Sequence, residues 1–304
     1  MKKSKLKIKN KITFSLFVII LLSIIAFVLL KPKNVDKNIL ASQNETTQDE
    51  NNNDKNEDIV KEESIEIKKQ VPISCNAAIP IFMYHWIRED TGDYMYPENM
   101  VRPSSLEEQV KYIAENNFDS IFISDLDNIY EYKKPIALTF DDGWLDVYIH
   151  MFPLAQKYNV KFTMYVITGE IGNNGYCNME QLKEMQKSGL VDIQSHTVTH
   201  PYLADLSYEK QKQELSESRR HLKEEYGIES NTICYPFGSR NENTVSLAKE
   251  IGYTYGLDMD GGVYYTNIHT NLYKIPRIYA NRSMSIGTFA NYANKSKVDV
   301  IWEQ

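Results

Sequence analysis

Cysteine is scarce in this chain of 304 residues. The three cysteines, Cys75, Cys177 and Cys234, allow at most one internal disulfide and leave one thiol over, and their spacing matches no metal-binding pattern. A disulfide between Cys75 and Cys177 remains an open alternative, whereas Cys234 lies in the apolar stretch TICYPF and is expected to be a small buried side chain.

Acidic residues are absent from the first 33 positions, which contain eight of the 34 basic residues. Residues 34–304 therefore hold 26 basic and 41 acidic side chains, so their net charge is −15, whereas the whole chain carries −7. A domain of this charge is not expected to bind nucleic acid or anionic lipid. The sequence predicts no nucleic-acid partner and gives no indication of a protein partner.

Charged residues are also absent from the apolar run Ile12 to Leu30, which as a helix would be ~28 Å long, close to the thickness of a bilayer core. Six lysines precede the run, so the positive-inside rule predicts a cytoplasmic tail at residues 1–11, a transmembrane anchor at 12–30 and everything after it outside the cell. The alternative is a cleaved signal peptide. We favour the anchor, because the run is longer than a signal peptide's apolar region and no small-residue cleavage site follows Leu30.

Apolar residues are missing from Gln43 to Glu57, and the sequence remains strongly polar up to about Lys69. Such a segment cannot offset its ordering entropy by burial, so residues 31–71 are predicted to be a disordered linker. A flexible coil of ~40 residues has an r.m.s. span of roughly 35 Å. The linker would let a membrane-anchored domain reach the inner part of a cell wall.

Residues 72–304 are predicted to form one α/β domain, because short apolar runs alternate with amphipathic stretches. This order, with near-continuous apolar strands, favours a distorted (β/α)7–8 barrel with its active site at the carboxyl ends of the strands. One predicted helix begins at Ser105 in a capping box with Glu108. The predicted strands are 79–85, 120–124, 135–140, 161–167, 190–195, 232–237, 253–257 and 274–280, and the other predicted helices are 145–158, 179–187, 207–226 and 242–251.

Polar clusters follow three of these strands. Asp141 and Asp142 follow strand 135–140 in LTFDDGW, and His196 and His200 follow strand 190–195 in SHTVTHP. The β-branched residues between the histidines, and the proline after them, predict a tight turn that brings both rings together. Two imidazoles and one carboxylate are a ligand set of open Zn²⁺ sites. Asp142 could then bind the metal while Asp141 stays unligated as a base, although DDG alone is also a common turn.

The three clusters resemble the motifs of the polysaccharide deacetylases of carbohydrate esterase family 4. TFDDG (139–143), HTVTH (196–200) and YPFG (235–238) are similar to the first, second and third motifs, and the resemblance covers roughly residues 72–282. It implies a catalytic base at Asp141. It also implies one divalent ion, Zn²⁺ before Co²⁺ or Ni²⁺, on Asp142, His196 and His200. The third motif implies a groove wall at Tyr235, Pro236, Phe237 and Gly238, with the Phe237 N–H facing the oxyanion.

Two departures from the family pattern concern residues that would assist the base and the leaving group. The arginine that usually precedes the third motif is replaced by Cys234, and Arg277 in IPRIYA is our candidate to take its place. The C-terminal Leu-x-His is absent, so we expect His85 in MYHWI to be the general acid. These features are similar to those of the subgroup that acts on poly-β-1,6-N-acetylglucosamine and of related cell-wall deacetylases. We expect His150 and His221, which lie in predicted helices, to be solvated or packed, and His269, in the polar loop TNIHTN, remains the alternative general acid.

The resemblance implies hydrolysis of N-acetyl groups from N-acetylglucosamine in peptidoglycan or in poly-N-acetylglucosamine, with release of acetate. An esterase that removes O-acetyl groups from xylan or a wall polymer is the alternative. A glycan-binding module without activity is a third, disfavoured because Asp141 and the expected metal ligands are all present. Aromatic residues near the strand ends are candidates for stacking against sugars: Tyr84, Trp86, Trp144, Tyr235 and Phe237.

Overall fold

The computed structural model describes residues 72–90, 92 and 96–302. The predicted cytoplasmic tail, transmembrane anchor and linker all lie outside the described residues. Within the part that is described, no helix has the length and apolar character needed to cross a membrane.

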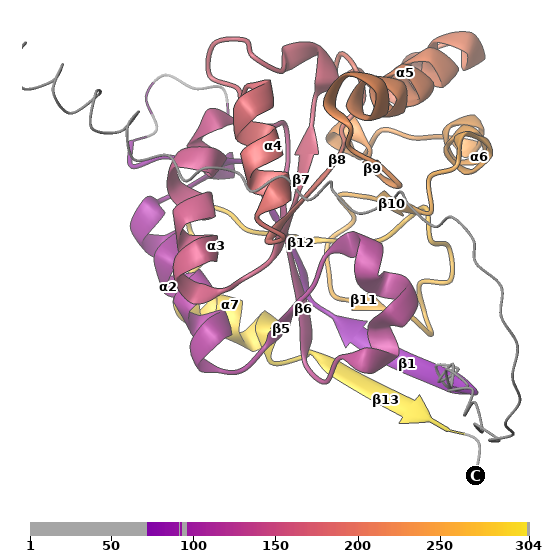
Figure 1. The fold of residues 1–304 in the computed structure, drawn as a ribbon. Helices are drawn as coiled ribbons and strands as arrows, with labels where there is room; N and C mark the ends of the chain where they lie inside the picture. Colours follow the sequence, from indigo (N-terminus) through magenta and orange to yellow (C-terminus); the bar gives the residue numbers. More distant parts are fainter. Residues whose placement is uncertain (1–71, 91, 93–95, 303–304) are drawn as a thin grey trace, which may run out of the picture. The chain divides into compact units, whose positions relative to one another are not determined.

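A sheet of eight parallel strands forms the centre of the domain (Figure 1). Its order is β10-β9-β8-β7-β6-β2-β12, and β5 pairs with the first half of β6. The strands are β2 Ile81–Tyr84, β5 Asp119–Ser120, β6 Pro135–Phe140, β7 Phe162–Val166, β8 Val191–Ser195, β9 Thr232–Cys234, β10 Tyr255–Leu257 and β12 Ile278–Tyr279.

The sheet curls so that its two edges are linked by the segment leading into β12. Ile275 N–H donates to the carbonyl of Gly256, and Asp258 N–H donates to the carbonyl of Ile275, which ties this segment to β10. A few residues later, β12 pairs with β2 at the other edge. The predicted parallel α/β sheet, curled as in a barrel, is confirmed.

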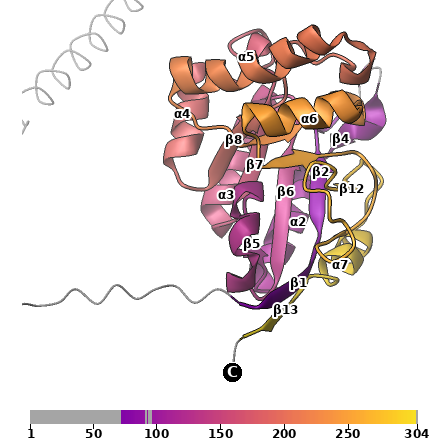
Figure 2. The same ribbon diagram turned by 90° about the vertical axis from the view of Figure 1, so that its right-hand side faces the viewer.

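Six α-helices are present in the described residues, and the ones next to β8 and β9 matter most for the site. Figure 2 shows α5 lying beside α6, and α5 also packs against β8. The predicted helices 179–187 and 242–251 are confirmed to the residue, and α5 follows Ser207 and ends before Gly227. The helices are α2 Pro103–Glu115, α3 Phe152–Tyr158, α4 Met179–Lys187, α5 Tyr208–Tyr226, α6 Glu242–Ile251 and α7 Ile286–Ala293.

Two local predictions are wrong. The capping box at Ser105 is absent, because α2 begins two residues earlier at Pro103, whose fixed φ suits the first helical position. The predicted strand 120–124 ends at Ser120, and the chain continues as the 3₁₀ segment η2 (Ile123–Glu131). The predicted helix 145–158 is helical over its whole length, but it contains a π-helical segment η3 (Val147–Met151) before α3, where Pro153 has no N–H to donate to the preceding turn.

Two smaller sheets and several short 3₁₀ segments complete the domain. The antiparallel sheet β11-β1-β13 was not predicted, and β3 pairs in parallel with β4. These strands are β1 Ser74–Ile79, β3 Trp86–Ile87, β4 Met100–Val101, β11 Tyr264–Tyr265 and β13 Lys297–Ile301. The remaining 3₁₀ segments are η1 Pro97–Asn99, η4 Thr168–Glu170, η5 Leu203–Asp205 and η6 Pro236–Gly238.

Side chains alternate across the central sheet. In β6, Leu138 and Phe140 belong to the apolar cluster shared with α2, α3 and α4, whereas Ala137 belongs to the cluster enclosed by the curl of the sheet. Thr139 lies on the same inner side as Ala137, since successive side chains of a strand point to opposite faces. The period of two therefore directs the next odd-numbered residue, Asp141, into the curl.

The three cysteines are free. Cys75 lies in β1 opposite Val300 of β13, and Cys177 is buried with its thiol donating to the carbonyl of Trp144. The disulfide that the sequence left open between them is therefore not formed.

Candidate active site

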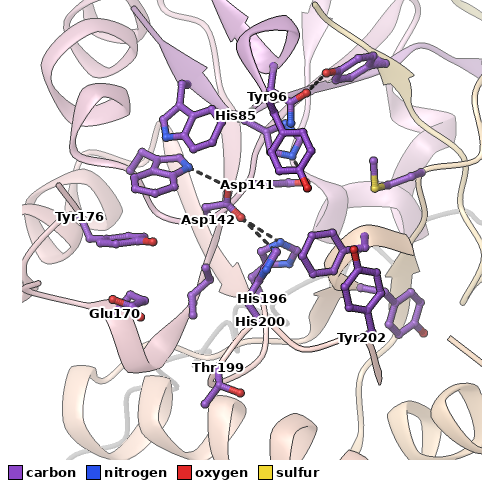
Figure 3. Close-up of a pocket in the computed structure, with 18 of the residues that line it drawn as sticks. His85, Tyr96, Asp141, Asp142, Glu170, Tyr176, His196, Thr199, His200 and Tyr202 are labelled. Carbon is purple, nitrogen blue, oxygen red and sulfur yellow. Dashed lines mark hydrogen bonds and ion pairs between the residues drawn. The ribbon is translucent and has the colours of Figure 1, made fainter. Parts of the chain in front are cut away.

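A cleft of about 700 Å³ lies at the carboxyl ends of the parallel strands. The two adjacent aspartates and three of the six histidines of the chain line it (Figure 3). The sequence predicted an active site at the carboxyl ends of the strands, and these side chains do meet there. The lining residues used below are His85, Trp86, Tyr96, Asp141, Asp142, Trp144, Tyr176, His196, His200, Tyr202, Phe237 and Tyr279.

Asp141 forms a bidentate ion pair with Arg277. Nη1 and Nη2 of Arg277 donate to Oδ1 and Oδ2 of Asp141, both at 2.8 Å, and the arginine is completely buried. Arg277 also donates from Nε to the carbonyl of Asp258 and from Nη1 to the hydroxyl of Thr139, each at 3.0 Å. The arginine predicted from IPRIYA therefore contacts the predicted base and fixes the plane of its carboxylate.

Burial alone would raise the pKa of Asp141. The positive charge of Arg277 and its hydrogen bonds outweigh burial and hold the pKa below its ordinary value. Asp141 is therefore an anion at neutral pH and is able to accept a proton.

Asp142 points to a different set of partners. Its φ is +75°, in the left-handed region, and this turn of the backbone separates its carboxylate from that of Asp141. Oδ1 lies 3.4 Å from Nε2 of His196 and 3.3 Å from Nε2 of His200, while Oδ2 accepts a hydrogen bond of 2.8 Å from Nε1 of Trp144. The two like charges are tolerated side by side because each is compensated by its own partners.

The atoms of Asp142, His196 and His200 fit a divalent metal ion. One ligand atom from each lies within 4.8 Å of the others. Nδ1 of His196 is 2.7 Å from the carbonyl of Cys234, an acceptor that makes Nδ1 the donor and leaves the lone pair on Nε2 for an ion. Burial, followed by the neighbouring His196, lowers the pKa of His200 to about 4, whereas the contacts of His196 with Cys234 and Asp142 outweigh burial and raise its pKa, so His196 would release a proton when an ion binds.

The segment between the two histidines is a turn, as predicted, and not a helix. Thr197 and His200 have φ values of +66° and +58°, and His200 N–H donates to the hydroxyl of Thr197. The reversed backbone brings the two imidazole centres to 4.8 Å. His196 and His200, four positions apart, thus approach each other without a helix between them.

His85 directly follows β2 and lines the same cleft at the carboxyl ends of the strands. Its Nε2 is 3.9 Å from Oδ2 of Asp141, and its ring stands edge-on to Tyr279 at 6.5 Å between centres. The other three histidines do not line the cleft. His150 lies in η3, His221 faces Glu217 and Glu225 along α5, and His269 contacts the backbone of Tyr265.

Two aromatic stacks lie on either side of the candidate metal site. Trp144 stacks on Tyr176 at 4.3 Å between ring centres, and Trp86 lies tilted against Trp144 at 5.0 Å. Tyr202 and Phe237 stack in parallel at 4.0 Å and are 52% and 42% exposed. These open ring faces suit contact with a sugar.

Two of the five predicted sugar-stacking residues are unsuited to that role. Tyr84 and Tyr235 are completely buried, so their rings offer no face to a ligand, and Pro236 is buried too. Tyr84 donates instead to Gln109 at 2.7 Å, and Tyr235 packs between β9 and the helices α5 and α6. Phe237 has φ +57° and projects from η6 into the cleft beside His200.

Sequence reasoning missed four aromatic residues of the cleft: Tyr96, Tyr176 and Tyr202, which come from loops, and Tyr279, which ends β12. Tyr202 follows the HTVTHP stretch by one residue, a signal that was available in the sequence. Tyr96 and Tyr176 lie far from every motif, and only the folded chain brings them to the cleft.

Comparison with known proteins supports this geometry. Residues 130–256 match the family model for polysaccharide deacetylase. YxkH of Bacillus subtilis is 29% identical over 226 residues, covering 73% of this chain and 78% of that protein. The poly-beta-1,6-N-acetyl-D-glucosamine N-deacetylase of Staphylococcus aureus is 27% identical over 197 residues, covering 59% of this chain and 67% of that one.

A solved structure shares the fold over most of the domain. It is the deacetylase PplD of Streptococcus pyogenes in complex with acetate, with 27% identity, a TM-score of 0.66 and coverage of 73% of this chain and 99% of that one. The matched segment 130–256 contains Asp141 and the three candidate metal ligands Asp142, His196 and His200. Residues 130–256 therefore carry the sequence pattern of the polysaccharide deacetylase family.

Proposed function

We propose that this enzyme hydrolyses the N-acetyl groups of N-acetylglucosamine units in a cell-wall or extracellular polysaccharide and releases acetate. The observation that carries the proposal is the separation of two adjacent carboxylates. Asp141 is held by Arg277, and Asp142 by two imidazoles and an indole, in one cleft. One carboxylate is thus arranged as a base and the other as a metal ligand.

Each polar residue of the cleft has a role in this reaction. A divalent ion on Asp142, His196 and His200 would supply Lewis acidity toward the acetamide carbonyl. Asp141 accepts a proton from the water that attacks the carbonyl carbon, and the backbone N–H of Phe237 is our candidate donor to the oxygen that becomes negative.

Breakdown of the adduct requires a proton on the leaving nitrogen. His85 is our candidate to donate it as the C–N bond breaks, which yields acetate and a glucosamine unit. Its ring borders the cleft 3.9 Å from Asp141, so both groups lie within reach of one bound acetamide.

Zn²⁺ is the metal we propose, with Co²⁺ or Ni²⁺ as substitutes. Two imidazole nitrogens and one carboxylate favour these ions, whereas Mg²⁺ and Ca²⁺ prefer sites made of oxygen atoms alone. Protein stripped of metal and titrated with each ion should bind Zn²⁺ with the highest affinity of those tested.

A polymeric substrate is supported by the aromatic stacks on both sides of the site. Sugars next to the acetylated unit would pack on Trp86 and Tyr176 at one end and on Tyr202 and Phe237 at the other. A relative that acts on poly-beta-1,6-N-acetyl-D-glucosamine favours the same class of glycan.

The decisive experiment compares acetate with new primary amines. The full-length protein is incubated with poly-N-acetylglucosamine, with peptidoglycan and with O-acetylated xylan. We expect equal amounts of acetate and amine from one or both N-acetylated polymers. Acetate from the xylan with no amine from either of the other two would instead assign an O-acetyl esterase.

We also propose that the chain is held in the cell membrane by residues 12–30, with the enzyme domain on the cell-wall side. The support is the sequence alone, namely a long apolar run preceded by lysines. Fractionation of cells should recover the full-length chain with the membranes. Recovery of a shortened, freely secreted domain would indicate cleavage of the N-terminal segment.

A further inference from the structure

The turn that carries the two candidate metal-ligating histidines adopts an unfavourable backbone conformation. Thr197 and His200 both have positive φ, although neither is glycine. Such conformations are unfavourable for residues other than glycine and persist only where surrounding groups hold them. The groups that hold this turn therefore help to determine where the imidazole of His200 points.

One side of the turn is held by the backbone of η4. Thr168 and Gly169 donate their N–H groups to the carbonyls of Thr197 and Val198, each at 3.0 Å. A Cβ on Gly169 would lie 2.6 Å from the carbonyl oxygen of Val198, so only glycine allows this approach. These bonds satisfy the carbonyls of the turn but leave its N–H groups to other partners.

The opposite side is held by one carboxylate, that of Glu214 on α5. Its Oε2 accepts hydrogen bonds from the N–H groups of Val198 at 2.8 Å and Thr199 at 2.9 Å. Its Oε1 accepts from the hydroxyl of Thr199 at 2.6 Å. Figure 3 shows Thr199 directed away from the metal-binding edges of His196 and His200. Glu214 thus holds the outer side of the turn through charge-assisted hydrogen bonds.

The helix that carries Glu214 is itself fixed on the sheet. One turn before Glu214, the buried Gln211 accepts a hydrogen bond of 2.6 Å from Thr244 of α6. One turn after it, the hydroxyl of Ser218 lies 2.7 Å from that of Ser195, the residue that precedes His196. Glu214 is therefore presented to the turn from a rigid element and not from a loop.

We propose that Glu214 is a positioning residue for the metal site. It contacts neither the ion nor the substrate, and it acts through Val198 and Thr199 to hold His200 in the direction that places Nε2 beside Oδ1 of Asp142. The inference rests on the metal site of the proposed function. Without this carboxylate the turn loses three of its hydrogen bonds, all of them in the two residues that precede His200.

The test compares Glu214→Gln with Glu217→Gln in the full-length protein. The amide that replaces the carboxylate of Glu214 would keep the volume and one acceptor oxygen, but it would lose the negative charge and could not accept from the backbone N–H groups and from the Thr199 hydroxyl at the same time. Glu217 lies on the same helix and pairs with Arg220 on the outer surface, so it is a matched control. Each metal-free protein is titrated with Co²⁺, and both the Kd and the visible absorption spectrum of bound Co²⁺ are recorded.

We expect Glu214→Gln to weaken Co²⁺ binding about 10- to 100-fold, the usual scale for groups that orient metal ligands, and to alter the Co²⁺ spectrum. Glu217→Gln should match the unsubstituted protein in both. Thr199→Val removes only the hydroxyl contact, so it should cause a smaller loss and provides a second variant if Glu214→Gln does not fold.

The outcomes separate this inference from the proposed function. If the unsubstituted protein binds no Co²⁺, the metal site fails and the inference fails with it. If that protein binds Co²⁺ and Glu214→Gln binds it with the same Kd and spectrum, only the positioning role is overturned. A lower melting temperature without a change in metal binding would mean that Glu214 merely stabilises the fold.

Discussion

Arg277 and Asp141, 136 positions apart in the sequence, face each other through two parallel hydrogen bonds of 2.8 Å in the interior of the domain. The arginine comes from the segment that links the two edges of the sheet, and the aspartate comes from the end of β6. Closure of the sheet and orientation of the candidate base therefore depend on the same contact.

Substitution of Asp141 by asparagine should abolish turnover while leaving metal binding intact. The amide has almost the same shape but cannot accept a proton, and loss of general base assistance typically lowers rates about 10²- to 10⁴-fold. Acetate release and the bound metal are measured on the same preparation. Loss of the metal together with activity would show that the roles of Asp141 and Asp142 are reversed.

Arg277→Ala should destabilise the domain as well as inactivate it. The substitution leaves the buried Asp141 carboxylate without its partner, and breaking a buried pair on one side costs about 3–5 kcal/mol. Thermal unfolding should therefore show a lower melting temperature. An unchanged melting temperature would mean that the pair contributes nothing to folding.

Arg277→Lys is the better test of orientation, because it keeps a positive charge but loses the bidentate geometry. Arg277 outweighs burial and lowers the pKa of Asp141, so a weaker partner should let that pKa rise. Asp141 must be deprotonated to act as a base, and the acidic limb of the pH profile of kcat/KM should therefore move to higher pH. A profile that falls in height without moving would contradict this account.

His85→Gln should bind metal normally and lower kcat by about 10²-fold or more, because the amide cannot supply a proton to the leaving nitrogen. His269→Gln is the control, since His269 contacts the backbone of Tyr265 and does not line the cleft. A fully active His85→Gln together with an inactive His269→Gln would move the general acid to the C-terminal loop.

Trp144→Phe should weaken metal binding about 10- to 100-fold without removing a ligand. The indole donates a hydrogen bond of 2.8 Å to Oδ2 of Asp142, and such outer contacts orient the ligand. The Kd for Zn²⁺ is measured by competition with a chromophoric chelator. A Kd equal to that of the unsubstituted protein would show that the stacked ring serves the substrate alone.

The parts of the site that lie in short motifs were predictable from the sequence. The alternation of β6 places Asp141 inside the curl, and the β-branched residues around Val198 argue against a helix between the histidines; both features act over a few residues. The pairing of Arg277 with Asp141 was predictable only because a family resemblance directed attention to a missing arginine.

Contacts that depend on packing between distant segments were not predictable. Nothing in the sequence links Glu214 to the turn after β8 or brings Tyr96 to the cleft. Helix α7 is stabilised by packing of Phe289 and Ala293 into the main core. The sequence did not predict it, because so short a helix has too few apolar positions to show a helical period. Tyr235 failed as a sugar contact because a strand-end aromatic residue is equally suited to the core.

The most direct test of metal-dependent N-deacetylation is to restore the activity of metal-free protein with a known number of equivalents of metal. The full-length protein is stripped with a chelator, exchanged into metal-free buffer and mixed with poly-N-acetylglucosamine and increasing Zn²⁺, with Asp142→Asn treated in parallel. The account predicts that acetate and amine formation is lost in the stripped protein and returns to a plateau at one Zn²⁺ per chain, and that Asp142→Asn recovers little. Full activity in the stripped protein, or recovery of Asp142→Asn at the same single equivalent, would contradict it.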